Sequence, residues 1–378
     1  MKKSNVTVLG CGLVGSAIAK DLSEYTEVIA VDLNETALES LKSFNIKTLK
    51  GDVSNPELIK ELALKTDIFI GAVPGFLGFN TVKSIIETGT DVVDISFFPE
   101  DAFLLDELAK KHNVTAIVDC GVAPGMGNVI LGHYDQKMKI YDYYCEVGGL
   151  PKVREWPYEY KAVFSPRDVI EEYTRPARLK INNQMVVREA LSDIVLDEYE
   201  GIGTLESWNS DGLRSLLKTM EHIPTLIEKT LRYPGTTQHL KVLRETGYFS
   251  EEPVKIGNNT IRPIDLTAAL LFPKWTLKPG EKEFTVMKIQ MKGIDGDKKK
   301  EVEYYLYDEF DEIKGISSMA RTTGYTCTAA ARLIMDKKYN QKGVIPPEYI
   351  GLTDDNFEFI LKHLSDRNVI YKRSEKII

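Results

Sequence analysis

The first 118 residues alternate between short apolar runs and segments whose apolar residues recur at helical spacing. The apolar runs predict six strands, at residues 6–9, 27–32, 46–50, 67–73, 92–95 and 114–118. The segments between them predict helices at residues 16–23, 35–44, from Pro56 onward, 80–88 and 101–112. Continuous apolar strands joined by helical crossovers are typical of a parallel sheet buried on both faces. We therefore predict an α/β fold whose first domain is a doubly wound parallel sheet.

Beyond Gly132 the pattern changes. Residues 139–147, 284–292 and 300–307 alternate apolar and polar side chains, and Asp295-Gly296-Asp297 predicts a hairpin turn between the last two. Helical spacing follows at 212–231, where Pro224 interrupts it, and again at 317–336. From Gly343 onward we expect a loop, a helix at 355–365 and a short strand. The predicted parts are 1–131, an α+β domain with a mixed or antiparallel sheet at 132–315, and C-terminal helices at 316–378 that return to the first domain.

A glycine-rich turn follows the first strand, where residues 10–15 read Gly-Cys-Gly-Leu-Val-Gly. Gly10 permits a tight turn, Gly12 lets the backbone approach a pyrophosphate, and Gly15 allows the next helix to pack closely on the strand. The N-terminus of that helix presents unpaired N–H groups and the positive end of its dipole to the phosphates. The sequence thus predicts a Rossmann dinucleotide-binding domain, with Leu13 and Val14 also at the cofactor.

An acidic residue, Asp32, ends the second strand seventeen residues after Gly15. At this position a carboxylate accepts hydrogen bonds from the adenosine ribose and repels a 2′-phosphate. No Lys or Arg stands in the next three positions, Leu33-Asn34-Glu35. We therefore expect NAD rather than NADP as the cofactor.

The carboxyl ends of parallel strands meet at the ligand-binding edge of a doubly wound sheet. Asp52 follows the third strand, where we favour an adenine contact over a helix cap because Ser54-Asn55-Pro56 already supplies cap residues. Asp94 and Asp119 end neighbouring strands, where each either relays a proton or caps the following turn. The remaining cofactor candidates at strand ends are Val53, Val73, Pro74, Gly121, Pro124, Gly125 and Met126.

Composition narrows the class of protein. The formal charge of −8 over 378 residues argues against nucleic-acid binding, and we expect a small-molecule substrate. The four cysteines form no Cys-x-x-Cys pair and the five histidines show no metal-ligand spacing, so we expect no metal site and a reducing compartment. No apolar stretch is long enough to span a membrane, and the first residues lead directly into a strand rather than a signal peptide. We expect a cytoplasmic protein that forms a homo-oligomer, most simply a dimer.

Three segments resemble the saccharopine dehydrogenase superfamily: residues 118–126, with the run Gly-Val-Ala-Pro-Gly-Met, residues 147–151 and residues 317–325. Within it, residues 164–165, 172–177 and 230–235 are most similar to the NAD-dependent lysine 6-dehydrogenases. That resemblance implies oxidation of the ε-amine of L-lysine to the 6-semialdehyde, which cyclises to a piperideine carboxylate. The chain departs from this branch at Thr236, where a histidine often stands, and it has His239 three positions later.

An amine dehydrogenase needs the neutral amine at hydride transfer, so Asp94 and Asp119 are the candidates to bind the ε-ammonium and relay its proton. An α-carboxylate calls for a guanidinium, for which we choose Arg214 and Arg232 over the other arginines. Asn209 and Tyr233 complete the candidate substrate residues.

Two other functions stay open. The same fold would serve a saccharopine or carboxyalkyl-polyamine dehydrogenase or reductase, whose second carboxylate needs a second cation from the arginines between Arg154 and Arg262. A non-enzymatic NAD-binding regulator is the third possibility.

Overall fold

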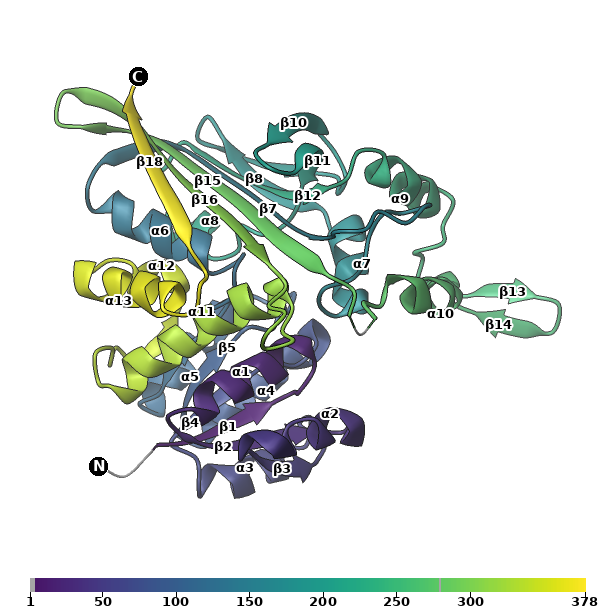
Figure 1. The fold of residues 1–378 in the computed structure, drawn as a ribbon, viewed down its shortest axis with the longest axis vertical. Coiled ribbons are helices and arrows are strands. Elements are labelled where there is room, and N and C mark those ends of the chain that lie inside the picture. The colour runs from purple at the N-terminus through teal and green to yellow at the C-terminus, as the bar shows by residue number, and fades with distance from the viewer. Residues whose placement is uncertain (1–3, 279) are drawn as a thin grey trace. The chain divides into compact units, whose positions relative to one another are not determined.

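The computed structural model describes residues 4–278 and 280–378, in two compact units (Figure 1). The first three residues, which bear on the expectation about a signal peptide, lie outside this range. Unit 1 contains the described residues up to Met138 together with Met319–Tyr371, and unit 2 contains those of Lys139–Ser318 together with Lys372–Ile378. The predicted boundaries lie at 131/132 and 315/316. In the structure the chain passes from one unit to the other slightly later, at 138/139 and 318/319. The predicted C-terminal segment, 316–378, is divided between both units.

Unit 1 is built on a seven-stranded sheet in which neighbouring strands run parallel, in the order β17-β6-β5-β4-β1-β2-β3. Its strands are β1 (Asn5–Leu9), β2 (Glu27–Asp32), β3 (Lys47–Lys50), β4 (Ile68–Gly71), β5 (Asp91–Asp94), β6 (Thr115–Ile117) and β17 (Gly343–Ile345). All six strands expected from the apolar runs are present. The prediction of a doubly wound parallel sheet is confirmed.

The helices of unit 1 comprise the crossovers between consecutive strands from β1 to β6 and further helices that come later in the chain (Figure 1). They are α1 (Leu13–Ser23), α2 (Glu35–Glu39), α3 (Pro56–Ala63), α4 (Gly75–Glu87), α5 (Asp106–Lys111), α6 (Met126–Asp135), α11 (Ser318–Met335), α12 (Pro347–Ile350), α13 (Asp354–Ser365) and the short 3-10 helices η1 (Lys42–Phe44) and η2 (Ala102–Leu105). Side-chain caps start several of them, as where Asn55 accepts a hydrogen bond from the N–H of Glu57.

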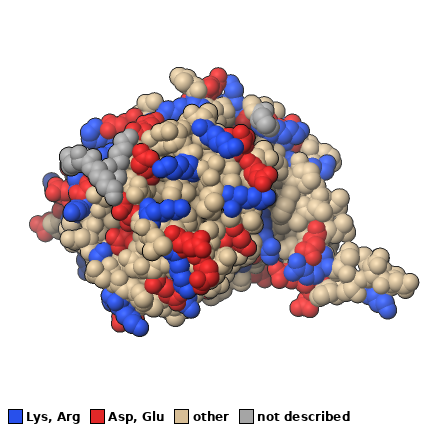
Figure 2. Space-filling model, turned by 90° about the horizontal axis from the view of Figure 1, so that it is seen from below, with Lys and Arg blue, Asp and Glu red and all other residues tan. Residues whose placement is uncertain are grey.

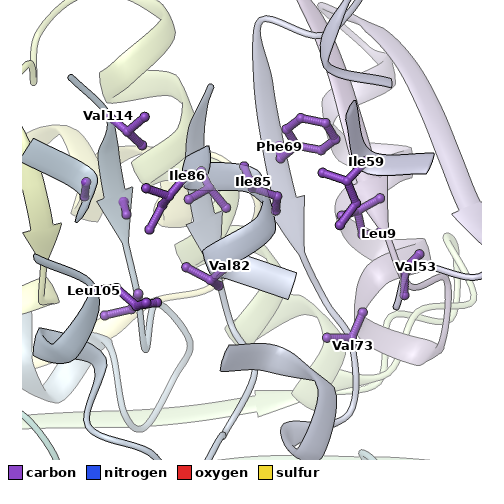
Figure 3. Close-up of a cluster of buried hydrophobic side chains, with 14 of the residues drawn as sticks. Leu9, Val53, Ile59, Phe69, Val73, Val82, Ile85, Ile86, Leu105 and Val114 are labelled. Atoms are coloured by element: carbon purple, nitrogen blue, oxygen red, sulfur yellow. The ribbon is translucent and has the colours of Figure 1, made fainter. Parts of the chain in front are cut away.

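One side of the sheet is covered by a continuous hydrophobic core (Figure 3). Leu9 and Phe69 from the central strands pack with Val82 and Ile86 from α4, and all four side chains are fully buried. β4 is buried along its whole length, as a parallel strand with helices on both faces should be. This core fixes the strand ends at which the predicted cofactor residues lie.

The expectation of a loop at Gly343–Ile345 is wrong, because these residues form β17 at the edge of the sheet. The N–H of Gly343 donates to Val114 O, and the N–H of Val118 donates to Ile345 O. Three residues are too few to show any periodicity. The strand exists because the exposed edge of β6 offers it unpaired backbone groups.

Unit 2 is built on a mixed nine-stranded sheet whose main path runs β10-β11-β12-β7-β15-β16-β18, with β8 paired to β12 and β9 paired to β8. Its strands are β7 (Lys139–Pro151), β8 (Ala177–Ile181), β9 (Gln184–Arg188), β10 (Val195–Tyr199), β11 (Gly203–Asn209), β12 (Thr225–Arg232), β15 (Glu283–Asp295), β16 (Lys298–Glu309) and β18 (Tyr371–Ile377). β7, β15 and β16 are antiparallel, and a turn at Gly296 joins the last two, as predicted. β12 runs parallel to β7, which makes the sheet mixed.

The helices of unit 2 are α7 (Pro166–Thr174), α8 (Leu216–Thr219), α9 (Thr236–Glu245) and α10 (Pro263–Trp275), and a separate hairpin of β13 (Val254–Ile256) and β14 (Asn259–Ile261) projects beyond α10 (Figure 1). The helical spacing expected over 212–231 is wrong for its last third, because residues 225–232 form β12, and in the rest of that range only α8 is helical. This strand lies inside the sheet, and its buried face carries the polar side chains of Glu228, Thr230 and Arg232, so its sequence lacks the apolar period of two.

Candidate functional site

The glycine turn of unit 1 leaves room where a pyrophosphate would lie. A Cβ on Gly10, whose φ is +93°, would lie 2.3 Å from Ala72 O, and one on Gly15 would lie 1.9 Å from Gly10 O. A Cβ on Gly12 would meet no atom within 4 Å. Gly10 and Gly15 are therefore required by the fold itself, whereas Gly12 faces open space. That pattern fits the separate roles expected for the three glycines.

The helix that follows begins without a side-chain cap. Gly12 is the N-cap residue of α1, and the first turn contains no acidic side chain. The unpaired N–H groups and the positive end of the helix dipole are thus available to an anion. Leu13 is half exposed at this end, while Val14 is partly buried. These residues fit the diphosphate of a dinucleotide.

Asp32 lies directly beside this turn. Its Oδ2 accepts a hydrogen bond from the N–H of Cys11 at 2.6 Å, and its Oδ1 accepts one from the N–H of Asn34 at 2.7 Å. Lys50, which lies opposite Asp32 on the neighbouring strand β3, is paired with Glu35 at 2.8 Å. The carboxylate at the end of β2 therefore stands next to the glycine turn, where an adenosine ribose is held in this fold.

The other predicted cofactor residues, at the ends of β3 and β4, differ in what they expose. Asp52 is exposed and accepts hydrogen bonds from the N–H and the hydroxyl of Ser54, which hold its pKa below the ordinary value. The side chains of Val53 and Val73 belong to the core shown in Figure 3, so only their backbones can face a ligand. Pro74 is exposed at the start of α4.

The two candidate acid–base residues lie at the ends of neighbouring strands. Asp94 is completely buried, with Oδ1 accepting from the N–H of Ser96 and Oδ2 accepting from its hydroxyl, both at 2.9 Å. Its backbone carbonyl accepts a hydrogen bond from the N–H of Cys120, next to Asp119. Asp119 is 4% exposed and has a left-handed backbone with φ of +53°. Such a conformation is uncommon outside glycine and is a feature of functional sites as well as turns.

A tight loop follows Asp119 at the carboxyl end of β6. The N–H of Gly121 donates to Pro124 O at 3.0 Å, and the N–H of Met126 donates back to Gly121 O at 3.1 Å. Gly125 has φ of +142°, and a Cβ there would lie 1.8 Å from Gly121 O. Thr323 of α11 packs on the loop, since a Cβ on Gly121 would lie 3.1 Å from its Cγ2. The loop is closed on itself and has a fixed shape.

The thiols near this edge are not nucleophiles. Burial, with the charge of Asp32 adding to it, raises the pKa of Cys11 to about 12. Burial, assisted by Asp119 and Asp94, raises the pKa of Cys120 well above its ordinary value. Both remain neutral thiols at physiological pH, as small buried side chains do.

In unit 2, Arg232 is 2% exposed and already has a carboxylate partner, because its Nη2 donates to Glu172 Oε2 at 2.9 Å. Its guanidinium carbon lies 4.2 Å from the centre of the Tyr160 ring and 5.5 Å from that of Trp208. Glu172 and Tyr160 had no role in the sequence-based site. Glu172 lies in the segment 172–177 and Arg232 in the segment 230–235, both already noted in the sequence. The presence of one acidic and one basic residue in these two segments is the signal that could have predicted the ion pair.

The other candidate substrate residues also lie inside unit 2. Asn209 is 1% exposed and donates from Nδ2 to Asp193 Oδ2 at 2.7 Å. The hydroxyl of Tyr233 donates to Pro151 O at 2.9 Å, and Arg154 lies over its ring. Arg214 is 9% exposed and has a left-handed backbone with φ of +51°.

Thr236 and His239, the two residues noted where the chain departs from the expected pattern, both lie on helix α9. Thr236 is buried at the start of α9, and its hydroxyl donates to Tyr158 O at 3.0 Å. His239, one turn further along, is exposed. Its ring lies edge-on to that of Tyr158 at 6.4 Å between centroids.

Neither a metal cluster nor a membrane span emerges from the described residues. In that part of the chain, no group of three or more His, Cys, Asp or Glu side chains is arranged to hold a metal ion. Among the helices described, none has the length and apolar character needed to cross a membrane. Lys and Arg are interspersed with Asp and Glu over the face drawn in Figure 2, without a continuous basic patch.

Two family models cover nearly all of the chain. Residues 6–117 match the saccharopine dehydrogenase NADP-binding domain, and residues 121–370 match the saccharopine dehydrogenase C-terminal domain. The chain belongs to the saccharopine dehydrogenase family. The resemblance expected from residues 118–126 and 317–325 is thereby confirmed at the level of this family of oxidoreductases, and unit 1 contains its pyridine-nucleotide-binding domain.

The curated members of the family to which the chain is similar are distant. It is 22% identical to saccharopine dehydrogenase [NADP(+), L-glutamate-forming] of Saccharomyces cerevisiae, over 99% of each chain. It is 21% identical to the mitochondrial alpha-aminoadipic semialdehyde synthase of Mus musculus, but it spans only 48% of that protein's length. The alignment with the yeast protein occupies 454 positions, whereas the chain has 378 residues, so the yeast sequence contains segments that the chain lacks.

A solved structure of the same family has the same fold. The structure of apo saccharopine dehydrogenase (L-Glu forming) from Saccharomyces cerevisiae matches with a TM-score of 0.80, covering 99% of this chain and all of that one, at 19% identity. The match includes the residues of both units, and it supports the α/β architecture described above.

Proposed function

We propose that this member of the saccharopine dehydrogenase family oxidises the ε-amine of L-lysine with NAD. The nucleotide supplies the hydride acceptor, and the ε-carbon loses a hydride and its nitrogen a proton, so that an iminium forms. Water then releases ammonia and the 6-semialdehyde, which cyclises to the piperideine carboxylate. Asp119, with Asp94 beside it in unit 1, is proposed to accept the proton from the ε-ammonium.

The observation that supports a monocarboxylate substrate is the charge balance of unit 2. Nine arginines lie between Arg154 and Arg262, all within described residues. Seven of these are paired with carboxylates of the same unit, namely Arg154, Arg175, Arg178, Arg188, Arg232, Arg244 and Arg262. A substrate with several carboxylates needs several cations whose charge is not already balanced. We therefore favour lysine over a larger substrate. Arg214 is proposed for its α-carboxylate on the sequence-based choice alone, because a guanidinium can bind a carboxylate through two hydrogen bonds.

The choice of NAD rests on Asp32. Its carboxylate stands beside the glycine turn, and Lys50 on the adjacent strand is paired with Glu35. A 2′-phosphate at this point would meet the negative charge of Asp32, and Lys50 already faces another carboxylate. The related yeast protein is named for NADP, so the activity of this chain has to be compared with NAD and with NADP.

Saccharopine is the second candidate substrate, because the yeast protein is named for it. The similarity to that protein covers 99% of both chains. In that case a secondary amine would be cleaved to an amine and a keto acid, or formed from them in reverse. The segments of the yeast sequence that are missing here weigh against a direct transfer of its substrate.

The test is formation of reduced nicotinamide, followed by absorbance, with lysine, ornithine or saccharopine as donor and NAD or NADP as acceptor. We expect the highest kcat/KM for lysine with NAD, and a piperideine carboxylate as product. Preferential turnover of saccharopine would replace lysine by the second candidate. Tight NAD binding with no turnover of any amine would leave the regulator as the correct function.

A further inference from the structure

The loop at Gly121–Gly125 is attached to a buried acidic residue that is distant in sequence. Helix α6 begins directly after this loop, and α12 packs against α6 within unit 1. The two helix backbones touch, because a Cβ on Gly132 would lie 2.1 Å from Glu348 O and one on Gly351 would lie 2.1 Å from Val129 O. Glu348 is therefore held in a fixed place relative to α6.

A chain of hydrogen bonds runs from this glutamate to the loop. Asn128 Nδ2 donates to Glu348 Oε2 at 3.0 Å, and the N–H of Gly125 donates to Asn128 Oδ1 at 3.2 Å. Glu348 is completely buried and Asn128 is 2% exposed. Because Oε2 of Glu348 accepts this bond, the NH₂ group of Asn128 has to face the carboxyl group. The amide oxygen of Asn128 then faces Gly125.

Gly125 controls the shape of the whole loop. Its left-handed backbone brings it against Gly121, and the bonds from Gly121 N to Pro124 O and from Met126 N to Gly121 O close the ring. A rotation of the Asn128 amide would leave the buried N–H of Gly125 facing another N–H group. That loss costs more than an ordinary hydrogen bond, because a buried donor is left unsatisfied.

The loop lies in the half of the sheet that serves the nicotinamide. In a doubly wound fold the two halves of the sheet each bind one mononucleotide, and the glycine turn after β1 places the adenosine over β1, β2 and β3. The carboxyl ends of β4, β5 and β6 are then left for the nicotinamide nucleotide. The Gly121–Gly125 loop follows β6 directly.

We propose that Glu348 is a positioning residue for the nicotinamide half of the coenzyme. It orients Asn128, which holds the Gly121–Gly125 loop in the shape that receives the nicotinamide ribose. This inference rests on the proposed function only in that the ligand is a pyridine dinucleotide; it does not depend on which amine is oxidised.

The experiment compares binding of NAD and of ADP-ribose, which lacks the nicotinamide, to the full-length chain by titration calorimetry. Glu348→Ala is expected to raise the Kd for NAD about tenfold, a loss in the range of one hydrogen bond, while the Kd for ADP-ribose stays unchanged. Glu348→Gln keeps the volume but lets Asn128 turn, and it is expected to change the ratio of the two Kd values in the same direction by a smaller factor.

The matched control is Asp21→Asn. Asp21 is another buried carboxylate of unit 1, 4% exposed, which accepts a hydrogen bond from Arg367 Nε at 2.6 Å and lies on α1 beyond the glycine turn. This variant is expected to lower the melting temperature and to leave the NAD to ADP-ribose ratio unchanged.

An equal loss of both ligands in Glu348→Ala, or an unchanged ratio, would overturn the proposal. If Glu348→Ala does not fold, the ratio measured for Glu348→Gln decides in the same way. Failure of the proposed function is seen separately, as absence of turnover with every amine in a wild-type protein that still binds NAD.

Discussion

The carboxylate of Asp32 accepts a hydrogen bond from the backbone N–H of Cys11 at 2.6 Å, which ties the end of β2 to the glycine turn. We expect Asp32→Ser to lower the ratio of kcat/KM for NAD to that for NADP by about tenfold or more, since the ribose loses a hydrogen-bond acceptor and a 2′-phosphate no longer meets a charge. Steady-state kinetics with both nucleotides measure this ratio. Glu39→Gln, an exposed change on the neighbouring helix α2, is the control and should leave it unaltered. An unchanged ratio in Asp32→Ser would show that the carboxylate does not select the coenzyme.

Two glycines of the same turn should respond differently to alanine. A Cβ on Gly12 meets no protein atom within 4 Å, so Gly12→Ala should keep the melting temperature of the ligand-free protein and weaken NAD binding by obstructing the diphosphate. A Cβ on Gly15 would lie 1.9 Å from Gly10 O, so Gly15→Ala should lose about 1–3 kcal/mol of stability as well as NAD binding. Calorimetry and thermal unfolding separate the two effects. Unimpaired NAD binding by Gly12→Ala would argue that the diphosphate lies elsewhere.

The two aspartates at the ends of β5 and β6 can be separated by amide substitutions. Asn adopts the left-handed backbone of Asp119 readily, so Asp119→Asn should fold normally. We expect it to lower kcat by about 10²–10⁴-fold, the usual contribution of a general base, and to change the shape of the pH–rate profile. Asp94→Asn should mainly weaken the turn fixed by Ser96, with a larger loss of melting temperature than Asp119→Asn. The reverse assignment follows if only Asp94→Asn changes the pH profile.

The buried ion pair of Arg232 and Glu172 should dominate the stability of its surroundings in unit 2. Arg232→Ala removes the partner of a carboxylate and empties the space between Tyr160 and Trp208, so the free energy of unfolding should fall by about 3–5 kcal/mol. Arg262→Ala breaks an exposed pair with Asp265 and should have a far smaller effect. Urea unfolding followed by tryptophan fluorescence reports the difference. Similar losses in both variants would mean that the buried pair has no special weight.

A neutral histidine in unit 1 predicts sensitivity to acid. Burial, with Arg367 and Arg332 adding to it, lowers the pKa of His363 to about 2, and its Nε2 lies 2.9 Å from the hydroxyl of Thr328. The unfolded chain takes up a proton on this side chain below pH of about 6.5, which the folded protein does not. Stability should therefore fall by about 1.4 kcal/mol per pH unit below that value from this group alone. The wild-type protein should lose stability more steeply between pH 6 and pH 4 than His363→Gln, as urea titrations at each pH will measure. Parallel curves would contradict the prediction.

Much of unit 1 was predictable because its strands are continuous apolar runs and its turn chemistry is local. The sequence predicted that Gly10 and Gly15 are needed for the turn and for helix packing, and that Gly12 leaves space for the diphosphate. The structure has close contacts at Gly10 and Gly15 and open space at Gly12. β17 was not predictable, because Gly343–Ile345 is a strand only through its long-range pairing with β6. β12 was misread because Glu228 and Arg232 lie on its buried face, so that its sequence does not alternate between apolar and polar residues.

The candidate site in unit 2 was harder to predict than that in unit 1. A sequence shows that Arg232 is a cation, but it does not show which carboxylate of the same chain already lies next to it. The pairing of Arg232 with Glu172 joins residues sixty positions apart. The connection from Glu348 through Asn128 to Gly125 spans more than two hundred positions and has no local signature.

The placement of β17 has a consequence for how the protein is made. When only the first 138 residues have been synthesised, six of the seven strands are present. The outer edge of β6 then stays unpaired until the segment near Val344 has left the ribosome. Exposed strand borders recruit other chains, so truncated products of this gene should be prone to aggregation. Expression of the nucleotide-binding half by itself would require residues 319–371 to be spliced onto it or supplied as a second polypeptide.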